Sequence, residues 1–376
     1  MRKIIIIGGG IGGTATALAL NQAGFEPVVY ERTQVLREVG AGIALWANAT
    51  HILKKLGLLE TAIQVGCLTT NYQFNSQRGK ELVNIEIDGF ELPVVAIHRA
   101  ELHQLLWRNV PGEKFHLGET FERFEHQHDR VHAYFVSGLE VEGDGLIGAD
   151  GLRSRVRATL LGDTPPTYRN FKTWRGLTDY VPSNYRPGYI QEFLGGGKGF
   201  GFMMLGKGKM YWYAAATAPE AQPDAVFGRK QELETMYQDW FSAIPELIAA
   251  TDEANILTTD LYDRPPTQPW SKGNITLLGD AAHPMLPTMG QGACTALEDA
   301  YVVAKCLEEN SDPIAAFQRY EDLRFPRTKA IVEQSLRSRK MGELKNPFAV
   351  SLRNTSMKIM GSAISSSFKS LHAYRA

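Results

Sequence analysis

The glycine-rich segment near the start of the chain constrains the fold most strongly. An apolar run over residues 2–7 leads directly into Gly8, Gly10 and Gly13, which fit the pattern G-x-G-x-x-G. In this pattern the glycines allow a tight turn, close approach of a phosphate to the backbone, and tight packing of a helix on a strand. The pattern therefore predicts a parallel strand over 2–7, a helix over 10–23, and a second strand that ends at Glu31.

This turn is typical of a dinucleotide site. A pyrophosphate is expected at the N-terminus of the 10–23 helix, where free N–H groups and the helix dipole favour an anion. Glu31 lies where a carboxylate accepts both ribose hydroxyls and repels a 2′-phosphate. A glycine-rich turn without a ligand is the alternative interpretation. The contacts predicted here are Gly8, Gly10, Ile11, Gly12, Gly13 and Glu31.

A second motif begins with a buried strand at 274–278 and continues as Gly279-Asp280-Ala281-Ala282-His283-Pro284. Asp280 is placed to bond a ribityl hydroxyl, and a helix over 292–307 directs its first N–H groups at a flavin pyrimidine. Such a helix stabilises the negative charge of reduced flavin. Together the two motifs predict FAD. The predicted contacts are Asp280, Pro287, Gly290, Gln291, Gly292 and Ala293.

Composition narrows the class of protein. The chain has 376 residues, 44% of them hydrophobic, with a net charge of -1, which is ordinary for a globular protein and argues against a nucleic-acid partner. The three cysteines have no metal-binding spacing, so no metal is expected. No apolar run is long enough to span a bilayer or to form a signal peptide, which predicts a cytoplasmic protein. We expect a monomer or a homodimer.

The motifs, in their order, resemble those of single-component FAD-dependent monooxygenases, a family that includes salicylate and urate hydroxylases and the related zeaxanthin epoxidases. The resemblance covers most of residues 1–340. It implies an α/β fold in which a Rossmann-type FAD-binding domain is interwoven with a mostly antiparallel β-sheet substrate domain, followed by C-terminal helices. The expected FAD-binding domain comprises 1–71, 95–170 and 270–340. The expected substrate domain comprises 72–94 and 171–269, and 341–376 form a C-terminal helical segment.

The same resemblance implies further FAD contacts. Arg99 matches an arginine that begins a helix beside the flavin, although a surface ion pair at the helix cap, with Glu101 or a neighbouring residue, is an alternative. Asp150 belongs to a motif in which Asp-Gly is followed by Ser154 and Arg155 and which the family associates with flavin and nicotinamide contacts, but it also fits an ordinary turn before a helix capped by Ser154. Val39 to Ile43 resemble the loop after the second strand. The contacts implied by resemblance are Arg32, Gly42, Ala44, Arg99, Phe121 and Asp150.

The implied reaction is the insertion of one oxygen atom from O2 into a hydrophobic or aromatic small molecule. NADPH or NADH, bound transiently, reduces FAD, and reduced flavin and O2 form a C4a-hydroperoxide that transfers the oxygen. Epoxidation of an alkene such as a carotenoid is one alternative. A flavin-dependent reductase or dehydrogenase is another, and a flavin-binding regulator a third. Urate-type members carry an arginine at the position of Gly199, so a urate-like substrate is not favoured.

The substrate is expected between the β-rich segment 172–216 and the flavin. Tyr211 is the first candidate for substrate contact, with Tyr213 and His283 behind it. Sheet packing is the alternative for the tyrosines, and a packing role the alternative for His283. Four side chains are expected to form an apolar wall of the pocket: Phe200, Phe202, Met203 and Met204.

The remaining patterns are helical. We predict helices over 46–57, 99–109 and 229–250, and a long helix over 313–341 that is kinked at Pro326. Residues 347–376 contain four basic residues and no acid, with apolar residues loosely at helical spacing. This segment predicts either a helix that packs on the flavin domain or one that touches a membrane surface, and packing is favoured.

Overall fold

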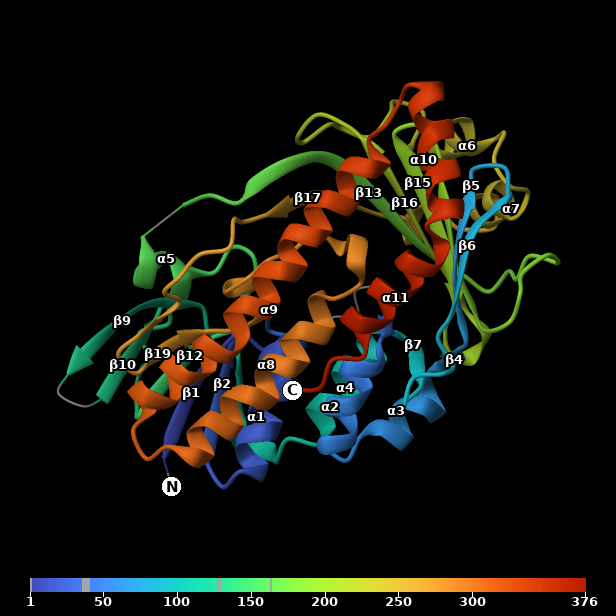
Figure 1. Ribbon diagram of the computed structural model, residues 1–376. Helices are drawn as coiled ribbons and strands as arrows, with labels where there is room; N and C mark the ends of the chain where they lie inside the picture. Colours follow the sequence, from blue (N-terminus) through green and yellow to red (C-terminus); the bar gives the residue numbers. More distant parts are fainter. Residues whose placement is uncertain (1, 36–40, 128–129, 163) are drawn as a thin grey trace.

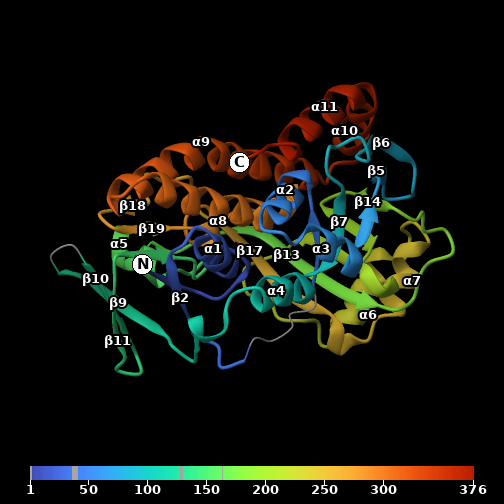
Figure 2. The ribbon, with the colours of Figure 1, turned by 90° about the horizontal axis from the view of Figure 1, so that it is seen from below.

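The computed structural model describes residues 2–35, 41–127, 130–162 and 164–376, and the other residues lie outside this description. Two large sheets lie at opposite ends of the molecule, and helices α8, Gly292–Glu309, and α9, Pro313–Gly342, run along one side of it (Figure 1). The same arrangement is visible after a quarter turn (Figure 2), where strand β13, Thr167–Thr178, extends from one part to the other.

The first sheet has six strands in the order β18-β19-β12-β1-β2-β8. Its inner strands are parallel to one another, and the short edge strand β18 pairs antiparallel with β19. Four consecutive isoleucines make β1 apolar on both faces, which suits the centre of a parallel sheet covered on both sides. The strands are β1 Lys3–Ile7, β2 Glu26–Glu31, β8 Phe115–Leu117, β12 Gly145–Gly148, β18 Ser271–Lys272 and β19 Ile275–Leu277.

Two small antiparallel sheets extend this part of the molecule. One has the order β11-β10-β9 and the other β3-β7-β4. The strands are β3 Gly42–Leu45, β4 Cys67–Thr69, β7 Val94–His98, β9 Phe121–Gln127, β10 Arg130–Phe135 and β11 Glu140–Gly143. The helices of this part of the molecule are α1 Ile11–Gln22, α2 Ala47–Lys55, α3 Leu59–Val65, α4 Arg99–Arg108 and α5 Arg155–Leu161.

The second large sheet has seven strands in the order β17-β13-β16-β15-β14-β5-β6. All neighbours pair antiparallel except β14 and β5, which are parallel. Strands β5 and β6 come from a segment far upstream of the others, so the sheet is completed only when the chain has folded back. The remaining strands are β5 Asn71–Ser76, β6 Glu81–Glu86, β14 Tyr189–Leu194, β15 Lys198–Met204, β16 Met210–Thr217 and β17 Leu257–Asp263.

The two faces of this sheet bury different side chains. One face forms an aromatic cluster with helices α6, Arg229–Tyr237, and α7, Ala243–Ala249. The other face is turned toward the first sheet, where the ring of Tyr211 lies against the backbone of Gly42 in β3. The second face is therefore the one that meets the dinucleotide-binding part of the chain.

The chain from Gly292 onward is mainly helical. It consists of α8 Gly292–Glu309, α9 Pro313–Gly342, α10 Pro347–Ile359 and α11 Gly361–His372. Helix α11 packs inward, because Phe368 and His372 are buried beside Trp46. Helix α10 leaves an apolar stripe exposed, namely Phe348, Leu352 and Ile359. Among the described residues, none of the helices combines the length and hydropathy needed to cross a membrane.

One helix prediction needs correction. The helix predicted over 229–250 is two helices, because the N–H of Phe241 donates to the carbonyl of Gln77 and Pro245 is accommodated only in the first turn of a new helix. The long helix predicted over 313–341 is confirmed as α9, which contains Pro326 in its interior, and the kink expected at that residue stays a prediction. The predicted fold class, an α/β protein with a Rossmann-type sheet, an antiparallel sheet and C-terminal helices, is confirmed.

Candidate functional site

The glycine turn between β1 and α1 is built by close approaches. Gly8 has a φ of +108°, and a Cβ there would overlap the carbonyl of Ala149. A Cβ at Gly12 would lie 2.8 Å from the side chain of Leu278, so this glycine lets α1 approach the strand of the second motif. A Cβ at Gly10, by contrast, meets nothing within 4 Å. The space in front of the first N–H groups of α1 is therefore open, as binding of a pyrophosphate requires.

Glu31 lies beside this turn. One carboxylate oxygen accepts the N–H of Gly9 at 2.7 Å, and the other accepts the N–H of Thr33 at 2.9 Å. Sequence reasoning missed His103, whose Nε2 lies 2.6 Å from the carbonyl oxygen of Gly9. Burial lowers the pKa of His103, so a neutral ring protonated at Nε2 holds the turn in place. No local pattern marked this histidine, because α4 reaches the turn only in the tertiary structure.

A second open helix N-terminus lies at the start of α8. Gly290 precedes it with a φ of +60°, and a Cβ at Gly292 meets nothing within 4 Å. The side-chain Nε2 of Gln291 and the indole nitrogen of Trp46 are buried, and neither has a hydrogen-bond partner within the described part of the chain. These donors suit the electron-rich carbonyl edge of a flavin pyrimidine, so the residues present fit the cofactor.

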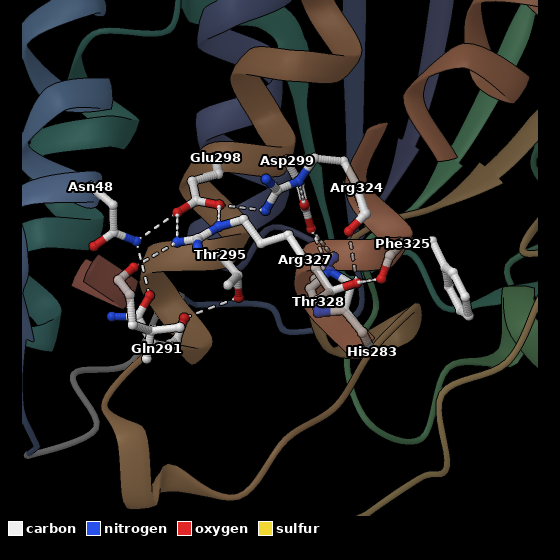
Figure 3. A network of polar contacts seen from close by, with 12 residues as sticks. Asn48, His283, Gln291, Thr295, Glu298, Asp299, Arg324, Phe325, Arg327 and Thr328 are labelled. Atoms are coloured by element: carbon white, nitrogen blue, oxygen red, sulfur yellow. Dashed lines mark hydrogen bonds and ion pairs between the residues drawn. The ribbon is translucent and has the colours of Figure 1, made fainter. Parts of the chain in front are cut away.

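Behind the start of α8 lies a buried ionic network (Figure 3). Glu298 accepts from the side chain of Asn48 at 2.6 Å and from Arg327 at 2.7 Å. Arg324 bonds Glu298 and Asp299, each at 2.6 Å. Burial raises the pKa of Asp299, but the neighbouring His283 and Arg324 outweigh that effect and bring it to about 2. The network fixes α8 relative to α2 and α9, and it thereby sets where the helix N-terminus points.

His283, a candidate base, belongs to this network. Its Nε2 lies 2.6 Å from a carboxylate oxygen of Asp299, and its ring packs beside Trp270. The side chain is buried. The structure thus places His283 behind α8, as the packing interpretation expects, and not on the sheet face that carries Tyr211.

Asp280 and Arg99 lie together near the opening between the two helix termini. Burial raises the pKa of the Asp280 carboxyl group, and the nearby His283 and Arg99, the residue that begins α4, offset only part of this effect. Glu101 pairs with Lys207 at 2.5 Å, so the alternative of an Arg99–Glu101 ion pair is not what the structure shows. An acid and a guanidinium near one another at this point provide an acceptor and a donor for a polar cofactor.

The other residues implied by the resemblance lie in several different parts of the structure. Asp150 caps α5, because its carboxylate accepts from the Ser154 hydroxyl at 2.5 Å and from the Arg155 N–H at 2.7 Å. Phe121 packs in the core against Phe135. Arg32 is exposed, and Val39 and Gly40 lie outside the described residues. Ala44, like Gly42, lies in β3, where its carbonyl is 3.7 Å from the thiol of Cys294 in α8.

The face of the large sheet that is turned toward the first sheet carries both candidate tyrosines. Tyr211 and Tyr213 lie two residues apart on β16, with ring centroids 6.2 Å apart. Burial raises the pKa of Tyr211 to about 12, so its hydroxyl is protonated at neutral pH. Because Tyr211 touches Gly42, this face meets the flavin-binding part directly.

The predicted apolar wall is wrong for three of its four members. Phe200 and Phe202 pack on the opposite face of the sheet, with Trp212 and Tyr237. Met204 contacts the same cluster, and only Met203 shares the face of Tyr211. Side chains along a strand alternate between faces, so one strand cannot direct consecutive residues into one pocket.

The fold and the site together define an FAD-binding protein of the monooxygenase type. The family model described as "FAD binding domain" matches residues 1–335. The chain is 38% identical to aurachin C monooxygenase/isomerase of Stigmatella aurantiaca, over 96% of this chain and 94% of that protein. It is 37% identical to the chloroplastic zeaxanthin epoxidase of Solanum lycopersicum, over 84% of this chain but only 49% of that protein.

Solved structures agree. The crystal structure of HpxO from Klebsiella pneumoniae with FAD and uric acid superposes with a TM-score of 0.92 at 26% identity, covering 99% of this chain and 97% of that one. A salicylate hydroxylase substrate complex matches in fold, with a TM-score of 0.83 at 23% identity, covering 99% of this chain and 95% of that one. The chain belongs to the FAD-binding-domain family and is a single-component FAD-dependent monooxygenase.

Proposed function

We propose that this enzyme uses NADH or NADPH, bound transiently, and O2 to insert one oxygen atom into a hydrophobic or aromatic small molecule. The observation that carries the proposal is the position of the α8 N-terminus. Its open first turn, at Gly292, and the face of the sheet bearing Tyr211 both adjoin β3. When bound, FAD supplies the redox chemistry that activates O2.

Each part of the site has an assigned task. The turn at Gly10 receives the pyrophosphate, Glu31 the adenosine ribose, and Asp280 a ribityl hydroxyl. The N-terminus of α8 would face the pyrimidine of bound FAD and would stabilise negative charge on it. Arg99 adds a positive charge near Asp280. The contact of Tyr211 with Gly42 brings the sheet close enough to exclude water from the reacting atoms.

The sheet face that carries Tyr211 favours an aromatic or lipophilic molecule as the substrate. Gly199 lies on this face without a side chain to grip a polar ring, in line with a substrate unlike uric acid. The curated relatives include an enzyme named for aurachin C and others named for zeaxanthin. Ring oxygenation is the first proposal, and epoxidation of an alkene is the second because the epoxidases are 33–37% identical.

A screen tests the proposed function. FAD-loaded enzyme is mixed with NADH or NADPH and a panel of aromatic and isoprenoid compounds, and cofactor oxidation, peroxide release and product mass are followed together. We expect at least one compound to stimulate oxidation and to gain a single oxygen atom. Stimulated oxidation without an oxygenated product would support a reductase instead. The position of the new oxygen separates ring hydroxylation from epoxidation.

A further inference from the structure

A half-buried carboxylate on the substrate-facing sheet is not used by any step described above. Glu192 lies on β14 and accepts a hydrogen bond from the hydroxyl of Tyr72. We propose that Glu192, held by Tyr72 and Tyr213, accepts a hydrogen bond from an N–H or O–H group of an aromatic substrate. This inference rests on the proposed function and narrows its substrate class to neutral aromatic molecules that carry such a donor.

The register of the sheet brings Glu192 and Tyr213 together. Glu192 is opposite Gly201 of β15, and Gly201 is opposite Tyr213 of β16, so all three lie on one face. Because Gly201 has no side chain, the ring of Tyr213 lies directly over β15, where a Cβ would overlap its hydroxyl. Tyr213 therefore crosses the intervening strand and interacts with the carboxylate of Glu192.

Tyr72 approaches the same carboxylate from the other side. It lies on β5, which pairs with β14 in parallel. Its ring packs edge-on against Trp46, with centroids 5.5 Å apart, and Phe368 of α11 stacks on it at 5.0 Å. Trp46 is the residue whose indole nitrogen lies beside Gly290 at the start of α8. Glu192 is thus linked through Tyr72 and Trp46 to the proposed flavin site.

The charge environment of Glu192 is unusual. Within the described ranges it has no salt bridge, and its polar partners are two tyrosines. Burial raises the pKa of Glu192 above its ordinary value, and the hydrogen bonds from Tyr72 and Tyr213 offset only part of this effect. The cation on the same face, Arg175, is opposite Tyr213 and donates to the hydroxyl of Thr259 at 2.6 Å. A carboxylate removed from water without a counter-ion lowers stability unless it has enough donors.

The carboxylate has capacity for another donor. An ionised carboxylate offers about four lone-pair sites, and the two tyrosines occupy about half of them. Both Glu192 and Tyr213 also keep part of their surface accessible. A phenolic O–H or a ring N–H would complete the set. The methylated analogue would leave the carboxylate undersatisfied, and an anionic substrate would be repelled by it.

Binding measured without turnover tests this inference. FAD-loaded protein is titrated with two pairs of probes, 2-naphthol with 2-methoxynaphthalene, and 4-hydroxyquinoline with 4-methoxyquinoline, and the flavin difference spectrum gives each Kd. The variants are Glu192→Gln and Tyr213→Phe. The matched control is Glu246→Gln, which also removes a carboxylate that accepts from a tyrosine, Tyr180, but on the outside of the sheet. FAD content and Tm confirm that each variant folds.

We expect the parent enzyme to bind at least one hydroxylated probe roughly tenfold or more tightly than its methyl ether. Glu192→Gln should abolish most of this preference by weakening the hydroxylated probe alone, Tyr213→Phe should reduce it, and Glu246→Gln should keep it. The inference is wrong if no donor-bearing probe is preferred, or if Glu192→Gln weakens both members of a pair equally. No nicotinamide is present in these titrations, so they measure binding without turnover. A missing preference for the donor-bearing probe would therefore contradict the role of Glu192 without bearing on whether the enzyme forms an oxygenated product.

Discussion

At the scale of single residues, the site depends on positions where a side chain must be absent. Gly10 faces open space, so Gly10→Val should leave the fold intact while its methyl groups occupy the place of the pyrophosphate. We expect the purified variant to lack most of its FAD, and Asp280→Ala to lose affinity as well. Gly112→Val is the control, because a Cβ there also meets nothing within 4 Å but lies outside the site. Unchanged flavin content in Gly10→Val and Asp280→Ala would refute the assignment of the turn.

Glu31 sets a second prediction at this scale. Its carboxylate is expected to exchange part of its bonding to the Gly9 N–H for the ribose hydroxyls of FAD. Loss of a hydrogen bond to a charged group costs about 1.5–3 kcal/mol, so Glu31→Ala should weaken FAD binding roughly tenfold or more. Titration of the apoprotein with FAD measures the change. An unaltered Kd would mean that Glu31 serves only to order the turn.

Tyr211 makes the contact between the large sheet and β3. The prediction for this residue concerns coupling, which is the fraction of the NAD(P)H consumed that leads to oxygenated product and not to peroxide. Tyr211→Phe keeps the ring against Gly42 and should leave FAD content unchanged. If the hydroxyl positions the substrate, a larger fraction of the NAD(P)H consumed should appear as peroxide on a substrate found in the screen. Coupling and turnover equal to those of the parent would reduce Tyr211 to a packing residue.

At the scale of elements, the position of α8 depends on ion pairs that are out of contact with water. Removal of one partner of a buried pair costs about 3–5 kcal/mol, so Arg324→Met should strongly lower the free energy of unfolding. Urea denaturation of the apoprotein measures it. The control is Arg319→Met, whose partner Glu309 is exposed and whose loss should cost no more than about 1 kcal/mol. Equal effects would mean that the network does not hold α8.

Helix α11 should respond to pH through His372. Burial lowers the pKa of this histidine to about 4, below the ordinary value of about 6.5 in an unfolded chain. The unfolded state therefore takes up the proton first, so the stability is complete above about pH 6.5 and declines as pH falls toward 4. Between pH 7.5 and 5 the loss amounts to about 2 kcal/mol. His372→Gln should flatten this part of the profile, and an identical slope in both proteins would contradict the prediction.

At the scale of the whole molecule, the C-terminal segment joins the two parts of the enzyme. Phe368 packs on Trp46 and on Tyr72 of the large sheet, and Arg327 donates to the carbonyl of Leu371. A chain that ends at Asn346 should therefore unfold at a lower temperature. We expect it to partition onto liposomes no differently from the full chain. Flotation of the full chain alone would show that the exposed stripe of α10 contacts lipid.

The sequence by itself determined the elements whose signals are local. The glycine turn, the strand before it and the helix after it follow from residues within one βαβ unit, and so does the place of Glu31. The motif at Asp280 predicted the helix that became α8. These features are readable because a tight turn and an open helix N-terminus restrict the residues that can occupy them.

Only the tertiary structure decided which residues share the site. Side chains alternate between the two sheet faces along β15, and this alternation separates Phe200 and Phe202 from Met203. The alternation does not say which face meets the flavin domain and which meets α6 and α7. Likewise Tyr72 and Glu192 are 120 residues apart, and they meet because β5 joins the edge of a sheet made by later strands. Such pairings depend on topology and register, which are properties of the assembled sheets and are not encoded within any one segment.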